Sequence, residues 1–287
     1  MDEIAPGIFI ETSFFGVNVG AVSTNKGMVA VDAPSFPRDA RSWAMTLHRL
    51  NHFAVQFAVL TDFHGDRILN TRWLNAPAIA HVKTTERIYS YDKRYPAPLL
   101  ESLSQRHPER SRELSNSPVD RPAISFSDQL FLFKGDKALE LTAVPGPTSG
   151  SIWMYVPEDK ILFVGDTLAV NTHPLLAEAH SAEWLASLDK LAEMAPDLKA
   201  IIPGRGPVCG GEAIEPVRQY IRAMRATINQ HIAADKPQEE TAVYIPEFLP
   251  AFPTNDTPPD WLKRQIKLSL DRVYTELKLE KNITETD

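Results

Sequence analysis

The chain has 287 residues, of which 43% are hydrophobic and 23% charged, and its formal net charge is −7 at pH 7. This size and composition predict a soluble globular protein with a sizeable core, and the lack of a basic surplus argues against nucleic acid as a partner. The single cysteine, Cys209, excludes a disulfide framework and a cysteine-rich metal cluster. No signal peptide or membrane span is recognisable at the N-terminus or elsewhere, so we expect a cytoplasmic protein without a membrane anchor.

The first part of the chain alternates predicted strands and helices. Trp43, Leu47 and Leu50 share one helical face, which predicts a helix over residues 39–50. A polar loop over residues 61–67 then leads into a short helix. Apolar and β-branched stretches bounded by turn residues predict the strands around these helices, at residues 8–15, 17–23, 29–32, 55–60 and 78–81.

The middle segment, residues 84–122, is rich in Arg, Glu, Ser and Pro. A connection of this length predicts a cap or binding segment packed over one edge of the core. A solvated insertion is the alternative interpretation, since surface loops tolerate extra residues.

The last part of the chain predicts a strand meander followed by helices. Strands are expected at residues 129–133, 138–144, 151–156, 161–164 and 200–202. Helices are expected at residues 182–194, 212–234 and 260–279. This order fits two sheets between helical layers. We expect one domain over residues 1–287, with a core at about 8–210 and a C-terminal helical segment, 211–287, that packs on the core or on a second copy in a homo-oligomer.

Polar loops follow several predicted strands, where α/β folds place their functional sites. Directly after the buried strand at residues 55–60, the chain reads LTDFHGDR from residue 60, and Asp62, His64 and Asp66 are spaced two apart. Residues two apart in an extended loop point the same way, so these side chains can converge. Three further loops read PGPTSGS from residue 145, GDTL from residue 165 and PGRGP from residue 203.

Together, these four segments resemble the motifs of the metallo-β-lactamase superfamily, which read T-H-x-H-x-D-H, P-G-H-T-x-G-S, G-D-T-L and P-G-H-G-P. The segments occur in the same order, and the resemblance covers roughly residues 8–210. It implies an α/β fold of the αββα four-layer sandwich type. It also implies hydrolysis of an ester, thioester, lactone or amide at a metal centre, although a superfamily this broad names no substrate.

Several metal-ligand positions of the family hold other residues in this chain. The matching residues are His64, Asp66 and Asp166. Other residues stand where the family has histidine, namely Asp62, Arg67, Pro147 and Arg205. By this resemblance, one metal position keeps three potential ligands, whereas the second keeps two carboxylates flanked by two arginines.

Arg67 and Arg205 argue against a metal ion at the second position. Arginine has no lone pair to offer and does not deprotonate in proteins. Each like-charge pair at about 4 Å costs roughly 4 kcal/mol at an effective dielectric constant of about 20. Bidentate pairs of the two arginines with Asp66 or Asp166 would take the place of that metal ion.

Three hypotheses about function follow. The first is a hydrolase-like protein with little or no metal and with His64, Asp66 and Asp166 as catalytic residues. The second is a mononuclear hydrolase that holds one Mn, Fe or Zn ion through Asp62, His64 and Asp166. The third is a binding or regulatory protein for a small anionic ligand, without catalysis. Its ligand-binding residues would be Arg67, Arg205, Phe14 and Phe15, the last two on the hairpin turn that overhangs the site in the family.

Overall fold

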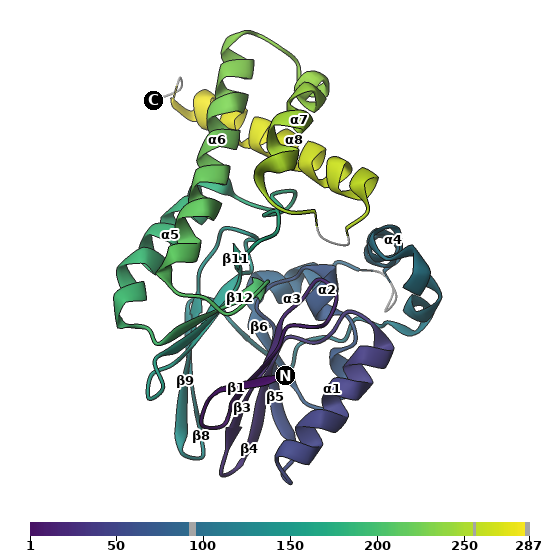
Figure 1. Ribbon diagram of the computed structural model, residues 1–287, viewed down its shortest axis with the longest axis vertical. Coiled ribbons are helices and arrows are strands. Elements are labelled where there is room, and N and C mark those ends of the chain that lie inside the picture. Colours follow the sequence, from purple (N-terminus) through teal and green to yellow (C-terminus); the bar gives the residue numbers. More distant parts are fainter. Residues whose placement is uncertain (92–95, 255–256, 285–287) are drawn as a thin grey trace.

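Two β-sheets lie face to face in the computed structural model, and helices cover their outer faces (Figure 1). The structure describes residues 1–91, 96–254 and 257–284. The two sheets and the flanking helices form the αββα sandwich that the sequence predicts, so the prediction of the fold class is confirmed.

The first sheet has seven strands in sequence order. They are β1 Asp2–Ala5, β2 Ile8–Glu11, β3 Val19–Thr24, β4 Gly27–Val31, β5 Val55–Val59, β6 Ala78–His81 and β7 Ile124–Phe126. Strands β1 to β4 pair antiparallel, while β4 to β7 pair parallel. The carboxyl ends of β4 and β5 therefore meet at one edge, next to the loop that carries Asp62 and His64.

The second sheet has five strands in the order β12-β11-β10-β9-β8. They are β8 Gln129–Lys134, β9 Lys137–Ala143, β10 Ile152–Val156, β11 Ile161–Ala169 and β12 Ala200–Arg205. Strands β11 and β12 pair parallel, so their carboxyl ends also share an edge. Apolar side chains of both sheets, such as Val29 and Val31 from the first and Leu141 and Phe163 from the second, form the core between them.

Helices form the outer layers. They are α1 Pro37–Leu50, α2 Gly65–Ile68, α3 Val82–Tyr89, α4 Ala97–Arg106, α5 Ser181–Met194, α6 Ile214–Ala233, α7 Ile245–Phe248 and α8 Pro259–Thr284. Trp43 and Leu47 of α1 are buried against the first sheet, which explains the apolar spacing of that segment. On the other side, α5, α6 and α8 share one large apolar cluster with the second sheet. Among the described residues, no helix has an apolar stretch long enough to cross a membrane.

Some elements differ from the sequence-based prediction. The strand expected over residues 8–15 ends at Glu11, whose carboxylate accepts a hydrogen bond from the Ser13 backbone N–H at 2.9 Å and closes a turn. The sequence did not predict the N-terminal strand β1, because this short segment begins with two charged residues and has no alternation of apolar and polar residues. Strand β11 runs on to Ala169, so Asp166 lies within a strand and not in a loop after it.

The segment 84–122 contains most of α3, all of α4 and a 3₁₀ segment, Pro108–Asn116. Residues 92–95 of this segment lie outside the described residues. Helix α4 stands away from the sheets and next to the beginning of the C-terminal helix α8, as Figure 1 shows. A hydrogen bond from Arg264 Nη1 to Gln105 Oε1, at 2.8 Å, joins the two helices. This placement brings α4 and α8 above the edge where the strands end.

Candidate functional site

The motif residues meet where the two sheets end. Asp62 and His64 follow β5, and Asp66 and Arg67 lie on the short helix α2. Asp166 in β11 and Arg205 at the end of β12 approach from the second sheet. The residue before Asp166, Gly165, has a φ of +52° and packs so closely on Thr61 that a Cβ would lie 2.8 Å from Thr61 Oγ1. The fold thus brings together the six motif residues named from the sequence.

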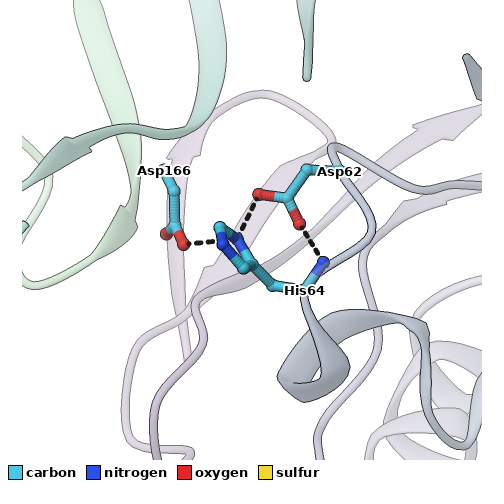
Figure 2. A group of neighbouring side chains, drawn as sticks. All are labelled: Asp62, His64 and Asp166. Atoms are coloured by element: carbon cyan, nitrogen blue, oxygen red, sulfur yellow. Dashed lines mark hydrogen bonds and ion pairs between the residues drawn. The ribbon is translucent and has the colours of Figure 1, made fainter. Parts of the chain in front are cut away.

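His64 lies between two carboxylates (Figure 2). Its Nδ1 is 2.8 Å from Asp62 Oδ2 and 3.1 Å from Asp166 Oδ2, and its backbone N–H donates to Asp62 Oδ1 at 2.8 Å. Burial alone would lower the pKa of His64, but the carboxylates of Asp62 and Asp166 raise it to about 10. The side chain is therefore an imidazolium cation at neutral pH, and its Nδ1–H donates toward both carboxylates.

Arg67 is fully buried, with 0% of its side chain exposed, and its guanidinium contacts three carboxylates. Nη1 lies 3.2 Å from Asp32 Oδ2, Nε lies 3.1 Å from Asp62 Oδ1, and Nη2 donates a hydrogen bond to Asp166 Oδ1. Although burial acts to lower the pKa of Arg67, Asp166 and Asp62 raise it well above its usual value. The side chain thus links the loops after β4 and β5 to β11 across the two sheets.

Arg205 forms an ion pair with the same carboxylate, that of Asp166. Its Nε and Nη2 lie 3.1 Å and 2.9 Å from the two Asp166 oxygens, and Nη2 is also 2.8 Å from Asp66 Oδ2. Burial would raise the pKa of Asp166, but Arg205 and then Arg67 hold it well below its usual range. The bidentate pair expected from the sequence is therefore present between Arg205 and Asp166.

Two further charged residues belong to the cluster and were missed in the sequence. Arg106, at the end of α4, places Nη1 3.2 Å from Asp66 Oδ2 and stacks over Trp261 of α8 at 5.0 Å. Asp32, directly after β4, accepts hydrogen bonds from Thr61 N at 2.8 Å and from Thr61 Oγ1 at 2.7 Å, and burial raises its pKa to about 6. The sequence offers only a weak sign for Asp32, its place after a predicted strand, and none for Arg106.

The charges of this cluster balance. Its four aspartates, Asp32, Asp62, Asp66 and Asp166, contribute four negative charges. The three arginines, Arg67, Arg106 and Arg205, contribute three positive charges and the protonated His64 contributes the fourth, so the sum is zero. Buried ions are tolerated only when they are paired and hydrogen-bonded, and here the pairs are made within the chain.

The second metal position of the family does not suit a cation in this chain. Two guanidinium groups, those of Arg67 and Arg205, already contact the carboxylates of Asp66 and Asp166 that would be its ligands. Arginine supplies no lone pair and its charge repels a cation. The residues present at this position do not fit a metal ion.

The first position has a donor set that does fit one divalent ion. Ligand atoms of Asp62, His64 and Asp166 all lie within 4.8 Å of one another. An ion there would exchange for the proton on His64, because a ligating imidazole nitrogen must be unprotonated. The donors that could hold a metal are thus the same three residues that share the His64 proton.

A cavity of about 560 Å³ opens onto the cluster, between α4 and α8. Its polar lining includes His64, Arg106, Arg205 and Arg264, and its apolar lining includes Leu99 and Trp261. Arg264 donates to the neutral amide oxygen of Gln105, so this hydrogen bond leaves its charge uncancelled. The lining also includes the carboxylates of Asp66, Glu101 and Glu178, so the cavity combines groups of both charges with apolar surface.

Phe14 and Phe15 lie away from His64. They line a different cavity, of about 430 Å³, and of the described residues only Arg106 and Arg205 also line the cavity over His64. Phe14 also packs edge-on against Trp43, with 6.3 Å between the ring centroids.

Two histidines outside the four motifs, His173 and His180, have their partners elsewhere in the fold. His173 is buried, and its Nε2 lies 3.0 Å from the Leu249 carbonyl oxygen. His180 precedes α5 and lies 3.2 Å from Glu276 Oε1. Pro147 is buried in its turn.

The sequence is similar to a family model and to curated proteins. A model of the metallo-beta-lactamase superfamily matches residues 12–205. Hydroxyacylglutathione hydrolase from Bartonella tribocorum is 41% identical over 71 residues, which cover 25% of this chain and 27% of that protein. Metallo-beta-lactamase type 2 from Pseudomonas aeruginosa is 23% identical over 191 residues, which cover 64% of this chain and 68% of that protein. The match thus spans about a quarter of the first relative.

Solved structures show the same fold. A metallo-beta-lactamase family protein from Thermus thermophilus matches with a TM-score of 0.69 and 18% identity, covering 98% of this chain and 95% of that one. A metallo-beta-lactamase from Pontibacter korlensis matches with a TM-score of 0.60 and 19% identity, covering 77% of this chain and 97% of that one. With the family model matching most of its length, this chain belongs to the metallo-beta-lactamase superfamily.

Proposed function

We propose that this protein is a hydrolase-like member of the superfamily that binds a small anionic ligand, at a centre where arginine–aspartate pairs take the place of the dinuclear metal site. One observation carries the proposal: the fully buried guanidinium of Arg67 contacts Asp32, Asp62 and Asp166, and so supplies the positive charge that a metal ion would bring. Removing this buried cation would leave its carboxylates without their shared partner.

The cavity over His64 supports a ligand with a negative charge. Arg106 and Arg205 each contact Asp66, and Arg264 adds a cation that bonds to a neutral partner. Guanidinium groups bind carboxylates and phosphates through paired N–H donors. Leu99 and Trp261 provide surface for an apolar part of the same ligand.

The cluster also limits what the motif residues could do in a reaction. With its pKa raised to about 10, His64 is protonated on both ring nitrogens at pH 7, so Nε2–H would donate to a substrate and could not accept from it. Asp66 and Asp166 direct their oxygens at arginines, so they would orient those groups. Catalysis by these residues would therefore take the form of proton donation by His64, with Asp66 and Asp166 orienting the arginines beside it.

A mononuclear metallo-hydrolase is the second candidate, and the specific observation in its favour is the approach of Asp62, His64 and Asp166 donor atoms to within 4.8 Å. A bound Mn, Fe or Zn ion would supply Lewis-acid chemistry there. The relative named hydroxyacylglutathione hydrolase makes a hydroxyacylglutathione the first substrate to test, followed by the esters, thioesters and lactones that the family resemblance implies. In this case Arg67 would hold Asp62 and Asp166 in place as ligands.

Elemental mass spectrometry of untagged protein, purified without chelators and then soaked with Mn²⁺, Fe²⁺ or Zn²⁺, separates the two candidates. The proposed function predicts no stoichiometric metal before or after soaking. About one equivalent of metal per chain, lost in His64→Ala and kept in the exposed control His48→Ala, would overturn it in favour of the mononuclear hydrolase. Thermal stabilisation by carboxylates and phosphates, absent with their amide or alcohol counterparts, is the expected sign of the anionic ligand.

A further inference from the structure

Strand β8 forms a free edge of the second sheet, because within the described residues it pairs with β9 alone. Leu130 and Leu132 face the core between the sheets, while Phe131 and Phe133 face outward and are 54% and 78% exposed. Natural proteins usually protect such an edge with charged residues or proline, which the outward-facing positions of β8 lack. An unprotected aromatic edge is typical of a strand that pairs with another chain.

The backbone groups of every second residue are free at this edge. The Ala143 N–H donates to the Asp128 carbonyl oxygen at 2.7 Å, so the backbone of Asp128 faces β9. In an antiparallel pair, alternate residues turn their N–H and C=O groups toward the partner strand. Gln129, Phe131 and Phe133 therefore direct these groups away from β9 and toward the open side.

The sequence around β8 is complementary to itself. When two copies pair antiparallel about a two-fold axis at Phe131, the outward backbone groups of one copy meet those of the other. Phe131 then lies opposite Phe131 of the other copy, and Leu130 lies opposite Leu132. At each end of the pairing, Lys134 lies opposite Asp128. Apolar side chains thus meet apolar ones and opposite charges meet, and such cross-strand pairs stabilise a sheet.

The charges of that end pair are available for a second copy. Asp128 is exposed, and it forms no ion pair in the part of the chain that the structure describes. Lys134 Nζ donates to the neutral amide oxygen of Gln56 at 3.1 Å, a contact that leaves its charge uncancelled. Both groups can therefore form the ion pair between copies without giving up one within the chain.

The exposed area sets the expected strength of this contact. Aromatic side chains bury about 150–250 Å² each, so the exposed parts of Phe131 and Phe133 amount to roughly 200–330 Å² per copy. A standard interface buries about 800 Å² per partner. The paired strands supply less area than a permanent dimer needs, so we expect a dimer that dissociates on dilution.

We propose that β8 is a dimerisation edge, at which a second copy of this chain pairs its own β8 antiparallel about Phe131 and joins the two five-stranded sheets into one. Such a dimer goes beyond the proposed function, since no residue of β8 lines the cavity over His64. It also gives the expected homo-oligomer an interface other than the C-terminal helical segment.

Sedimentation velocity of the full chain, measured from about 5 to 500 µM, tests for the dimer. We expect the mass to rise with concentration from 32.1 kDa, the mass of one chain, toward twice that value. A mass that stays at one chain over the whole range would overturn the proposal.

A lysine at the two-fold axis should separate the copies. Phe131→Lys places like charges directly opposite each other, so the dissociation constant should rise by at least about tenfold. Leu279→Lys is the matched control, because Leu279 lies on α8 and is 57% exposed, close to the 54% of Phe131. Loss of the dimer in the Leu279 variant alone would refute the proposal and assign the contact to the C-terminal helix.

A charge swap tests the register without touching the aromatic residues. Asp128→Lys alone sets like charges opposite Lys134 and should weaken the dimer. Combining it with Lys134→Asp restores opposite charges in the same pair, and the dissociation constant should return to within about threefold of that of the unchanged chain. A folded double variant that dissociates as readily as Asp128→Lys would contradict the pairing about Phe131.

Discussion

Replacing Arg67 with methionine removes the central cation of the cluster and keeps most of the side-chain volume. Arg67 is 0% exposed and contacts Asp32 at 3.2 Å, Asp62 at 3.1 Å and Asp166. Breaking a buried ion pair by removing one partner costs about 3–5 kcal/mol, because the remaining charge is left uncompensated. In a chain of 287 residues, each kcal/mol lowers Tm by roughly 2 °C, so we expect Tm to fall by about 6–10 °C.

Differential scanning calorimetry and urea unfolding at pH 7 measure this loss. Arg49→Met is the control, since Arg49 is exposed and its replacement should change the free energy of unfolding by less than about 0.5 kcal/mol. Adding Asp32→Asn to Arg67→Met should recover part of the loss, because among the described residues Asp32 forms an ion pair with Arg67 alone, at 3.2 Å. A loss below about 1 kcal/mol, or one that Asp32→Asn does not relieve, would refute the account of Arg67 as a compensating charge.

Three more predictions follow from the same structure. Restoring histidine at the four departures should create a zinc site, detected by elemental mass spectrometry, and a folded variant without zinc would contradict the assignment of motif positions. The four changes are Asp62→His, Arg67→His, Pro147→His and Arg205→His. Gly204→Ala should destabilise the protein by about 1–3 kcal/mol in urea unfolding, because a Cβ there would lie 2.8 Å from Arg67 Nη2 and closer to Asp166 Oδ1. Burial acts to raise the pKa of Glu276, but hydrogen bonds from Ser181 and Ala182 lower it below 4.5. The ionised Glu276 therefore contributes to stability above pH 4.5, and this contribution is lost as the pH falls. Glu276→Gln should therefore flatten the acid limb of a Tm-against-pH curve, and an unchanged limb would count against it.

Much of the fold could be predicted because its elements have clear local patterns. The helix over residues 39–50 and the buried strand at 55–60 correspond to α1 and β5, where apolar spacing reflects burial. Strand β1 has exposed polar residues, and its pairing with β2 is a tertiary contact that no local pattern reveals. The length of β11 was missed for the same reason, since its end is set by the pairing with β12.

At the candidate site, the sequence motifs predicted the residues that belong to them, and they gave no sign of residues that other segments of the chain contribute. Asp62, His64 and Asp166 were named together because they belong to recognisable segments. Arg106 comes from α4, 40 residues beyond Asp66 in the chain, and nothing around it marks an ion pair. The separation of Phe14 and Phe15 from His64 depends on where α4 places its arginine, which again requires the folded chain.

The cavity over His64 is bounded by parts of the chain that differ in their tolerance of substitution. Its floor is the ion-pair cluster, in which each change disturbs several charges at once. Part of its wall, including Arg264 and Leu268, belongs to α8, which lies outside residues 12–205 that match the family model. Neither residue belongs to the ion-pair cluster, so substitutions there would change the shape of the cavity and leave the buried charges untouched. If the cavity holds the proposed ligand, the preference for that ligand could thus change through the C-terminal helix while the centre beneath stays the same.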